Sequence, residues 1–319
     1  MAEMNHNLNL RAWELCERLV ADAAALRIDV RQLPGSARLI DCGAQTAGGL
    51  EAGRRLAEIC LAGLGQVALV PGDRDLWPGP AVQVVTDAPL AACMASQYAG
   101  WEVKEKNFFA LGSGPMRAAA AREEIFAKIG CTEKPDRAVG VLETRTPPPP
   151  EVVADIAAKC GVAADRLTLL YAPTASQAGT LQIAARSVET ALHKLFELGF
   201  DLNRVESGFG TAPLPPVAGK DIGAIGRTND AILYGGEVTL WVRGDDESLL
   251  AVGPKVPSSA SADHGRPFAD IFEHYGRDFY RIDPHLFSPA VVTFVNLDSG
   301  RTQRFGHTLP RVIHESFGK

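Results

Sequence analysis

The sequence predicts an α/β or α+β protein of two domains. Segments typical of helices and of strands alternate through the first third of the 319-residue chain, which is the pattern of mixed folds. A chain of this length can form two domains, and four consecutive prolines at residues 147–150 make a candidate boundary. We therefore predict an N-terminal domain of residues 1–146 and a C-terminal domain of residues 147–319, with an exchange of segments between them as the alternative.

Composition favours a globular protein that acts on a small molecule. The chain is 46% hydrophobic and 22% charged, and its net charge of −6 with no dense Lys/Arg block argues against a nucleic-acid partner. The first residues lack the basic and apolar regions of a signal peptide, and no apolar run approaches the ~20 residues that span a bilayer. We expect a cytoplasmic protein without a membrane partner.

The predicted elements follow from hydrophobic periodicity and from Gly and Pro stops. Helices are predicted over residues 10–26, 47–63, 90–99, 118–129 and 151–160. Strands are predicted over residues 38–42, 66–70, 81–86, 101–111, 137–143 and 166–171. After residue 200, we predict a helix from residue 221 or 228, strands at 237–242, 249–252 and 290–296, and short helices after 268 and in the tail.

One long helix, from the polar cluster at residues 174–179 to the stop at Gly199, is the element on which we expect the site to form. Apolar residues at helical spacing predict its buried stripe: Leu181, Ala184, Val188, Ala191, Leu192 and Leu195. A second stripe, roughly opposite, is polar: Gln182, Arg186, Glu189 and His193. This second stripe places a guanidinium and a carboxylate one turn apart.

Arg186 and Glu189 have two interpretations. In the functional one, the arginine sets the charge state of the glutamate, and the pair holds a water and takes its proton. In the other, they form an exposed i, i+3 ion pair that contributes a few tenths of a kcal/mol to stability, the usual case for this spacing. The pair alone does not decide between them.

A glycine turn, Gly112-Ser113-Gly114-Pro115, stands between a predicted strand and a predicted helix. It does not match the dinucleotide-binding fingerprint, because Arg117 occupies the place of the third small residue, and no Gly-Lys-Ser/Thr of a P-loop follows. The turn either binds a ligand through N–H groups at the helix start or provides the positive φ that the connection needs.

Neither the cysteines nor the histidines have the spacing of a metal site. The six cysteines occur singly, mostly in apolar segments, and are predicted to be reduced core thiols. The histidines form no H-x-H or H-E-x-x-H motif, and a G-x-S-x-G nucleophile elbow is absent. We predict no metal site and no covalent serine catalysis.

Four long stretches of the chain carry a resemblance to a known family. They are SQYAGWEVKEKNFFALGSGPMRA, APTASQAGTLQIAARSVETALHKLFELGFD, GFGTAPLPP and IGRTNDAILYGGEVTLWVRGDD. In this order they resemble the methenyltetrahydromethanopterin cyclohydrolases, over nearly the whole chain. The resemblance implies two side-by-side αβ domains with a pocket between them, assembled as a homotrimer.

The resemblance also implies an activity and roles for residues. Members of that family interconvert the cyclic N5,N10-methenyl cation of tetrahydromethanopterin and its open N5-formyl form in one-carbon metabolism, without a metal or a redox cofactor. The family's Arg-x-x-Glu falls on Arg186 and Glu189, which implies that Glu189 is the general base and that Arg186 orients the water. By the same resemblance, the residues that line the substrate pocket are Ser96, Gln97, Tyr98, Gly112, Ser113 and Gly114.

Two other functions remain open from the residues alone. One is a phosphate-handling transferase that uses the turn at residues 112–114, which would need a metal-binding Asp or a catalytic Lys nearby. The other is a non-catalytic pterin-binding or carrier protein, in which Arg186 and Glu189 only bind the ring. Tight binding without turnover would identify the carrier.

Overall fold

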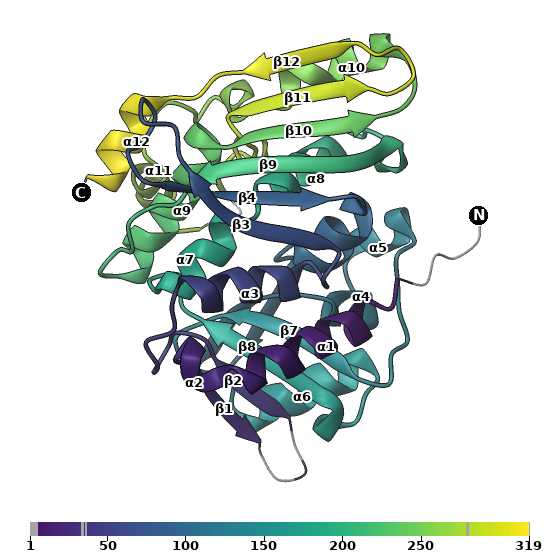
Figure 1. The fold of residues 1–319 in the computed structure, drawn as a ribbon, viewed down its shortest axis with the longest axis vertical. Coiled ribbons are helices and arrows are strands. Elements are labelled where there is room, and N and C mark those ends of the chain that lie inside the picture. Colours follow the sequence, from purple (N-terminus) through teal and green to yellow (C-terminus); the bar gives the residue numbers. More distant parts are fainter. Residues whose placement is uncertain (1–5, 33–34, 36, 279–280, 319) are drawn as a thin grey trace. The chain divides into compact units, whose positions relative to one another are not determined.

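The computed structural model describes residues 6–32, 35, 37–278 and 281–318, which form two compact units, each with its own sheet (Figure 1). Unit 1 comprises Met1–Gly65 and Ala91–Gln182, and unit 2 comprises Gln66–Leu90 and Ile183–Lys319. Helices combined with two mixed six-stranded sheets confirm the predicted α+β class. The predicted boundary at residues 146 and 147 lies inside unit 1, because strands on both sides of it pair in one sheet.

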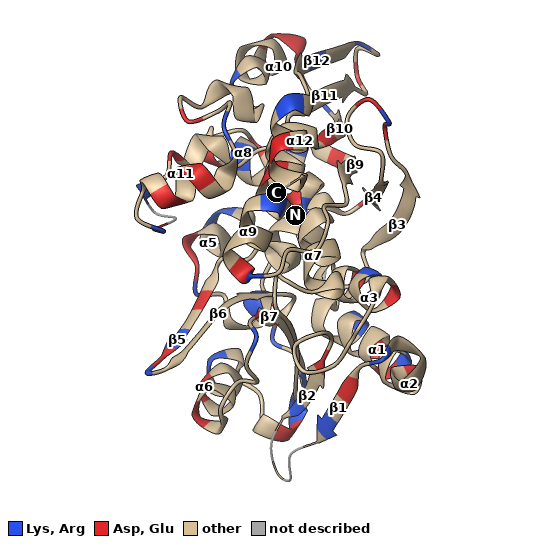
Figure 2. Cartoon of the chain, turned by 90° about the vertical axis from the view of Figure 1, so that its left-hand side faces the viewer, with Lys and Arg blue, Asp and Glu red and all other residues tan. Residues whose placement is uncertain are grey.

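Charged residues of both signs are mixed (Figure 2), and the prediction of reduced core thiols is confirmed for five of the six cysteines. Figure 2 shows acidic and basic residues interspersed along the helices in view. All six cysteines are free, and five are buried. Burial raises the pKa of Cys16 and of Cys160 to about 12, so both are protonated, unreactive thiols near neutral pH. Within the described ranges, every helix is too short or too polar to cross a bilayer.

The sheet of unit 1 has parallel strands at its centre. Its order is β1 (Asp29–Gln32), β2 (Arg38–Asp41), β8 (Leu167–Ala172), β7 (Ala138–Glu143), β6 (Phe108–Ser113) and β5 (Trp101–Glu105). Strands β2, β8 and β7 are parallel, and the remaining pairs are antiparallel. The single strand predicted at 101–111 is the β5–β6 hairpin, which turns where Lys106 adopts a φ of +35°.

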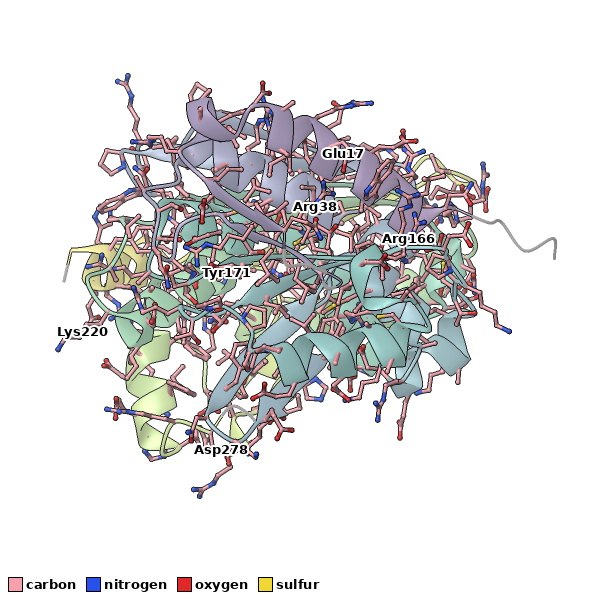
Figure 3. All side chains as sticks on the ribbon, turned by 90° about the horizontal axis from the view of Figure 1, so that it is seen from below. Glu17, Arg38, Arg166, Tyr171, Lys220 and Asp278 are labelled. Atoms are coloured by element: carbon pink, nitrogen blue, oxygen red, sulfur yellow. The ribbon has the colours of Figure 1, made fainter. Side chains whose placement is uncertain are left out.

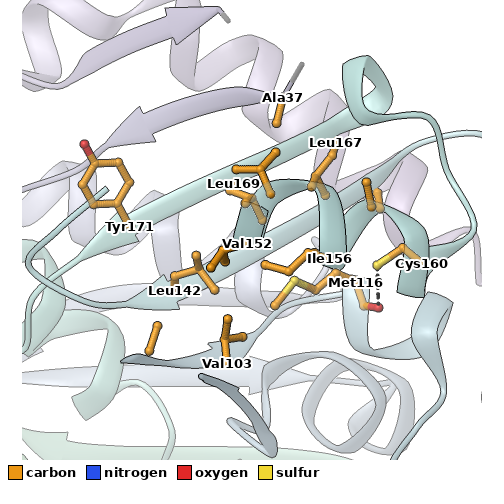
Figure 4. Packing of buried hydrophobic residues seen from close by; sticks show 14 of the residues in the cluster. Ala37, Val103, Met116, Leu142, Val152, Ile156, Cys160, Leu167, Leu169 and Tyr171 are labelled. Atoms are coloured by element: carbon orange, nitrogen blue, oxygen red, sulfur yellow. Dashed lines mark hydrogen bonds between the residues drawn. The ribbon is translucent and has the colours of Figure 1, made fainter. Parts of the chain in front are cut away.

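Both faces of this sheet are covered, which explains why β7 and β8 are almost continuously apolar. Val139 and Val141 pack in one cluster with α1 (Leu8–Ala21) and α3 (Leu50–Cys60). Leu142 packs in a second cluster with α6 (Pro150–Cys160). Figure 4 shows this second cluster, in which the Cys160 thiol donates to the carbonyl of Met116 at 3.5 Å. An ion pair of 2.6 Å between Arg38 of β2 and Glu17 of α1 also joins sheet and helix (Figure 3).

Asn9 of α1 is a fully buried amide that connects three segments of unit 1. Its Nδ2 donates to the carbonyl of Pro115 at 2.9 Å and to Oε2 of Glu133 at 2.7 Å. Its Oδ1 accepts the N–H of Val139 at 3.0 Å. Asn9 therefore holds α1, strand β7 and the turn before α4 (Met116–Ala120) in one arrangement.

Replacing Asn9 by alanine is expected to lower the free energy of unfolding by about 3 kcal/mol, because it leaves several buried polar groups without partners. Urea denaturation followed by circular dichroism measures the loss. The control is Leu10→Ala at the neighbouring residue, which is 43% exposed and should change stability by about 0.5 kcal/mol or less. Equal stability of the two variants would contradict the role of Asn9 in holding these segments together.

The sheet of unit 2 is mainly antiparallel. Its order is β12 (Thr302–Gly306), β11 (Val291–Asn296), β10 (Glu237–Val242), β9 (Val205–Pro213), β4 (Pro80–Thr86) and β3 (Gly65–Pro71). Strands β10 and β11 are parallel, while β9 is antiparallel to both β10 and β4. Buried and partly exposed residues alternate along β10, as expected for a sheet with one well-covered face.

Helices of unit 2 form a separate core and correct one prediction. α9 (Asp221–Gly235), α11 (Phe268–His274) and α12 (Pro310–Phe317) pack in an aromatic cluster that includes the buried Phe268 and Phe272. The strand predicted at 249–252 is wrong, because these residues belong to helix α10 (Asp246–Val252). Asp245 caps this helix by accepting the N–H of Ser248 at 2.7 Å, and a capped N-terminus favours helix over strand.

Candidate active site

The long helix of the sequence is two helices, and Arg186 lies at the break between them. α7 spans Gln177–Ala184 and α8 spans Ser187–Glu197. Arg186 is the N-cap residue of α8, with φ −95° and ψ 11°, and its N–H bonds to the carbonyl of Ile183. The prediction of one continuous helix is therefore wrong. The predicted apolar stripe is nevertheless buried at all six positions.

Glu189 lies in the first turn of α8, where the helix dipole favours a negative charge. Its Oε2 is 3.9 Å from Nη1 of Arg186, and the Arg186 and Glu189 side chains are only 8% and 4% exposed. The interpretation as an exposed ion pair is therefore wrong. A guanidinium and a helix N-terminus both favour the ionised carboxylate, whereas burial opposes it; the ionised form is the one that can accept a proton from water.

Two glycines of β9 let the first turn of α8 approach the sheet. A Cβ added at Gly208 would lie 2.7 Å from Cγ1 of Val188, and a Cβ added at Gly210 would lie 2.4 Å from Oγ of Ser187. Both distances are too short for non-bonded contact, so no larger residue fits without a shift. Ser187 and Val188 follow Arg186 directly and precede Glu189, so close packing here sets the position of the whole turn.

Ser96 and Gln97 end a π-helix in unit 1, η1 (Leu90–Gln97), and Tyr98 follows it. The N–H of Tyr98 bonds to the carbonyl of Cys93, five residues earlier, and closes the last π turn. Ser96 and Gln97 are fully buried, whereas Tyr98 is partly exposed. The Ser96 hydroxyl donates to the carbonyl of Cys60 at 2.6 Å, so it fixes the end of η1 to the end of α3.

The glycine turn lies beside the end of η1. Gly114 donates its N–H to the carbonyl of Ser96 at 2.8 Å, and this bond joins the two predicted substrate-binding segments. The φ of Gly114 is +86°, a conformation that favours glycine, as one of the two interpretations of the turn required. The Ser113 hydroxyl lies 3.4 Å from the carbonyl of Val141 and 3.7 Å from Sγ of Cys60.

The predicted residues therefore form two groups. Residues 96–98 and 112–114 lie together in unit 1, and Arg186 and Glu189 lie together in unit 2. A surface depression of about 730 Å³ in unit 2, lined by residues 69–72, 74 and 78–80, contains none of them. Among the described residues, no three His, Cys, Asp or Glu side chains are grouped as a metal site requires.

Lys194 of α8 is a buried cation that the sequence interpretation missed. It is 1% exposed, and its Nζ donates to the carbonyl of His285 at 2.5 Å. Burial lowers the pKa of Lys194 to about 8, against the opposing effect of the Asp283 carboxylate. The sequence feature that could have predicted its burial is its position between Leu192 and Leu195, two residues of the predicted apolar stripe.

The lowered pKa of Lys194 predicts a pH dependence of stability. Between pH 8 and the ordinary lysine pKa of 10.5, the unfolded chain binds more protons than the folded one, so the free energy of unfolding rises with pH. Relative to Lys194→Met, wild type should therefore gain stability from about pH 8 to about pH 10.5. Urea denaturation of both proteins across this range is the measurement. The control is Lys255→Met, because Lys255 is exposed. If the difference in free energy of unfolding between wild type and variant is independent of pH for both variants, the prediction is contradicted.

Comparison with known proteins places the chain. A family model described as cyclohydrolase (MCH) matches residues 7–317. The chain is 48% identical over 316 residues to the methenyltetrahydromethanopterin cyclohydrolase of Methylobacterium sp. (strain 4-46), covering 98% of this chain and 97% of that protein. It is 49% identical to the protein of the same name from Xanthobacter autotrophicus, covering 95% and 90%. It is 41% identical to that of Methanosarcina barkeri (strain Fusaro / DSM 804), covering 98% of each.

Fold and candidate site together define an α+β protein with a buried Arg–Glu pair at the start of a helix. The chain belongs to the cyclohydrolase (MCH) family, and it is an enzyme of the hydrolase class.

Proposed function

We propose that this protein hydrolyses N5,N10-methenyltetrahydromethanopterin to N5-formyltetrahydromethanopterin, reversibly, in one-carbon metabolism. The names of its relatives support the substrate. The observation that carries the mechanism is the buried pair of Arg186 and Glu189 in the first turn of α8, with 3.9 Å between Nη1 and Oε2.

Hydrolysis of the methenyl group requires a positioned general base. The carbon between N5 and N10 is amidinium-like and already cationic, so the step that needs help is the attack of a deprotonated water. Glu189 takes one proton as the water oxygen bonds to this carbon, and Arg186 orients that oxygen. The bond from the tetrahedral carbon to N10 then breaks as Glu189 returns the proton to N10. The hydroxyl on that carbon releases the second proton of the water to solvent and becomes the carbonyl of the formyl group, which stays on N5.

The same proposal gives residues 96–98 and 112–114 the role of binding the pterin. Its support is the bond that joins the two segments, from the N–H of Gly114 to the carbonyl of Ser96. Tyr98 is the partly exposed member of the first segment, so its ring is the part best able to contact a ligand. The proposed setting is a cytoplasmic homotrimer whose partner is the pterin substrate, without nucleic acid, metal or redox cofactor.

The test is the decay of the methenyl chromophore in the presence of wild-type protein and a metal chelator. Rapid loss, with N5-formyltetrahydromethanopterin identified as the product by chromatography, supports the proposal. Tight binding of the substrate without loss of the chromophore would instead support a carrier. Equilibrium dialysis with the same substrate separates that outcome from a protein that does not bind.

A further inference from the structure

Arg117 of α4 is a fully buried cation beside the two predicted substrate-binding segments of unit 1. A guanidinium is tolerated at 0% exposure only where it is paired and hydrogen-bonded, so its partners indicate what it holds in place. The mechanism above gives Arg117 no role, and in the sequence it only marked a departure from a dinucleotide fingerprint.

Glu123, the N-cap residue of α5 (Glu124–Ile129), provides the counter-charge. Nε of Arg117 donates to Oε1 of Glu123 at 2.9 Å, and Nη2 donates to Oε2. This two-point pairing fixes the plane of the guanidinium. Its Cζ lies 4.9 Å from the ring centroid of Tyr98 and 5.2 Å from that of Phe126, within the range of cation–π attraction.

The remaining nitrogen of Arg117 holds the end of the π-helix. Nη1 donates to the carbonyl of Met94 at 2.8 Å and lies 3.5 Å from the carbonyl of Ser96. Carbonyls in the last turn of a helix lack partners within the helix, so Arg117 supplies one from outside. Because the Ser96 carbonyl also accepts the N–H of Gly114, the end of η1 and the glycine turn meet at one point.

Gly100 shows how tightly this arrangement is packed. A Cβ added there would lie 2.1 Å from Oε2 of Glu123 and 2.5 Å from Cε1 of Tyr98. The carboxylate that pairs with Arg117 and the ring under its guanidinium therefore both rest against the backbone at Gly100. Any larger residue at this position would displace both of them.

We propose that Arg117 is a positioning residue for the pterin. It fixes residues 96–98 against residues 112–114, so that Tyr98 and the neighbouring backbone groups face the substrate in one geometry. The inference rests on the proposed role of these two segments in substrate binding. Lysine cannot replace Arg117, because an ammonium cannot pair with Glu123 at two points and also reach the carbonyl of Met94.

Steady-state kinetics of Arg117→Lys with methenyltetrahydromethanopterin tests the proposal. We expect KM to rise about 10- to 100-fold, the factor that corresponds to the loss of one charge-assisted hydrogen bond, while kcat falls by about threefold or less. Gly100→Ala, which displaces Glu123 and Tyr98 but keeps every charge, should raise KM in the same direction. If Arg117→Lys does not fold, Gly100→Ala provides the test in its place.

The matched control is Leu19→Ala, a cavity at a fully buried position of α1, in a core cluster whose members include no residue of either segment. A substitution that only destabilises the fold reduces the fraction of enzyme that is folded and active. It therefore lowers the apparent kcat and leaves KM unchanged. If Arg117→Lys and Gly100→Ala behave in that way, the positioning role is wrong. If wild type itself shows no hydrolysis, the proposed function fails, which is a separate outcome.

Discussion

Glu189→Gln is expected to lower kcat by about 10²- to 10⁴-fold, the usual contribution of a positioned general base. Glutamine keeps the shape of the side chain but cannot take a proton from water. Because the change leaves the buried Arg186 beside a neutral group, stability should also fall, and kcat must be calculated per folded protein, with the folded fraction measured by circular dichroism. The decay of the methenyl chromophore gives the rate.

Two companion variants sharpen this experiment. Glu197→Gln removes a carboxylate from the same helix at a side chain that is 42% exposed, and it should leave kcat unchanged. Arg186→Lys keeps the positive charge but loses the planar fork that orients the water, so its kcat should also be low. A kcat for Glu189→Gln equal to that of Glu197→Gln would keep the enzyme but discard Glu189 as its base.

Gly208→Ala is expected to reduce kcat by about 10²-fold, although Gly208 carries no reactive group. The new methyl group would overlap Cγ1 of Val188, and valine in a helix has one strongly preferred rotamer, so α8 must move instead. A displacement of about 1 Å in a catalytic group can cost that factor. Overpacking should also lower the free energy of unfolding by about 1–3 kcal/mol, measured by urea denaturation.

A second substitution tests the cause of this loss. Val188→Ala removes the contacted methyl groups, after which the nearest remaining atom to the new Cβ, apart from Val188 itself, is Cδ2 of Leu240 at 3.5 Å. The double variant Gly208→Ala/Val188→Ala should therefore recover most of the kcat that Gly208→Ala loses, with Val188→Ala alone as the reference. A double variant as slow as Gly208→Ala would show that the packing of α8 on β9 does not position Glu189.

Much of the fold followed from local patterns in the sequence. The parallel strands β7 and β8 were predicted because both of their faces are covered, which leaves a continuous apolar run bounded by polar segments. Strand β9 was missed because its glycines resemble a loop. Those glycines are present because α8 approaches them, a fact of tertiary packing that no local pattern contains.

The sequence predicted which residues belong to the candidate site, but it did not predict their burial or the helix break beside them. The spacing of Arg186 and Glu189 is the same for an exposed pair and for a buried one, so burial had to come from the structure. The helix break at Arg186 could not be predicted, because no Gly or Pro stands there in the sequence. Arg117 gave no signal because its partners, Met94 and Glu123, belong to separate elements that meet only in the folded unit.

Discontinuous units impose an order on folding during synthesis. Strand β4 pairs with β9, whose first residue leaves the ribosome roughly 120 residues after the end of β4, about 6–24 s later at typical rates of elongation. Unit 1 receives its last strand, β8, before β9 exists. The nascent β3–β4 segment must therefore wait with β4 lacking its β9 neighbour while unit 1 is completed, which makes it the part of the emerging chain that is most exposed to chaperones and to wrong pairing.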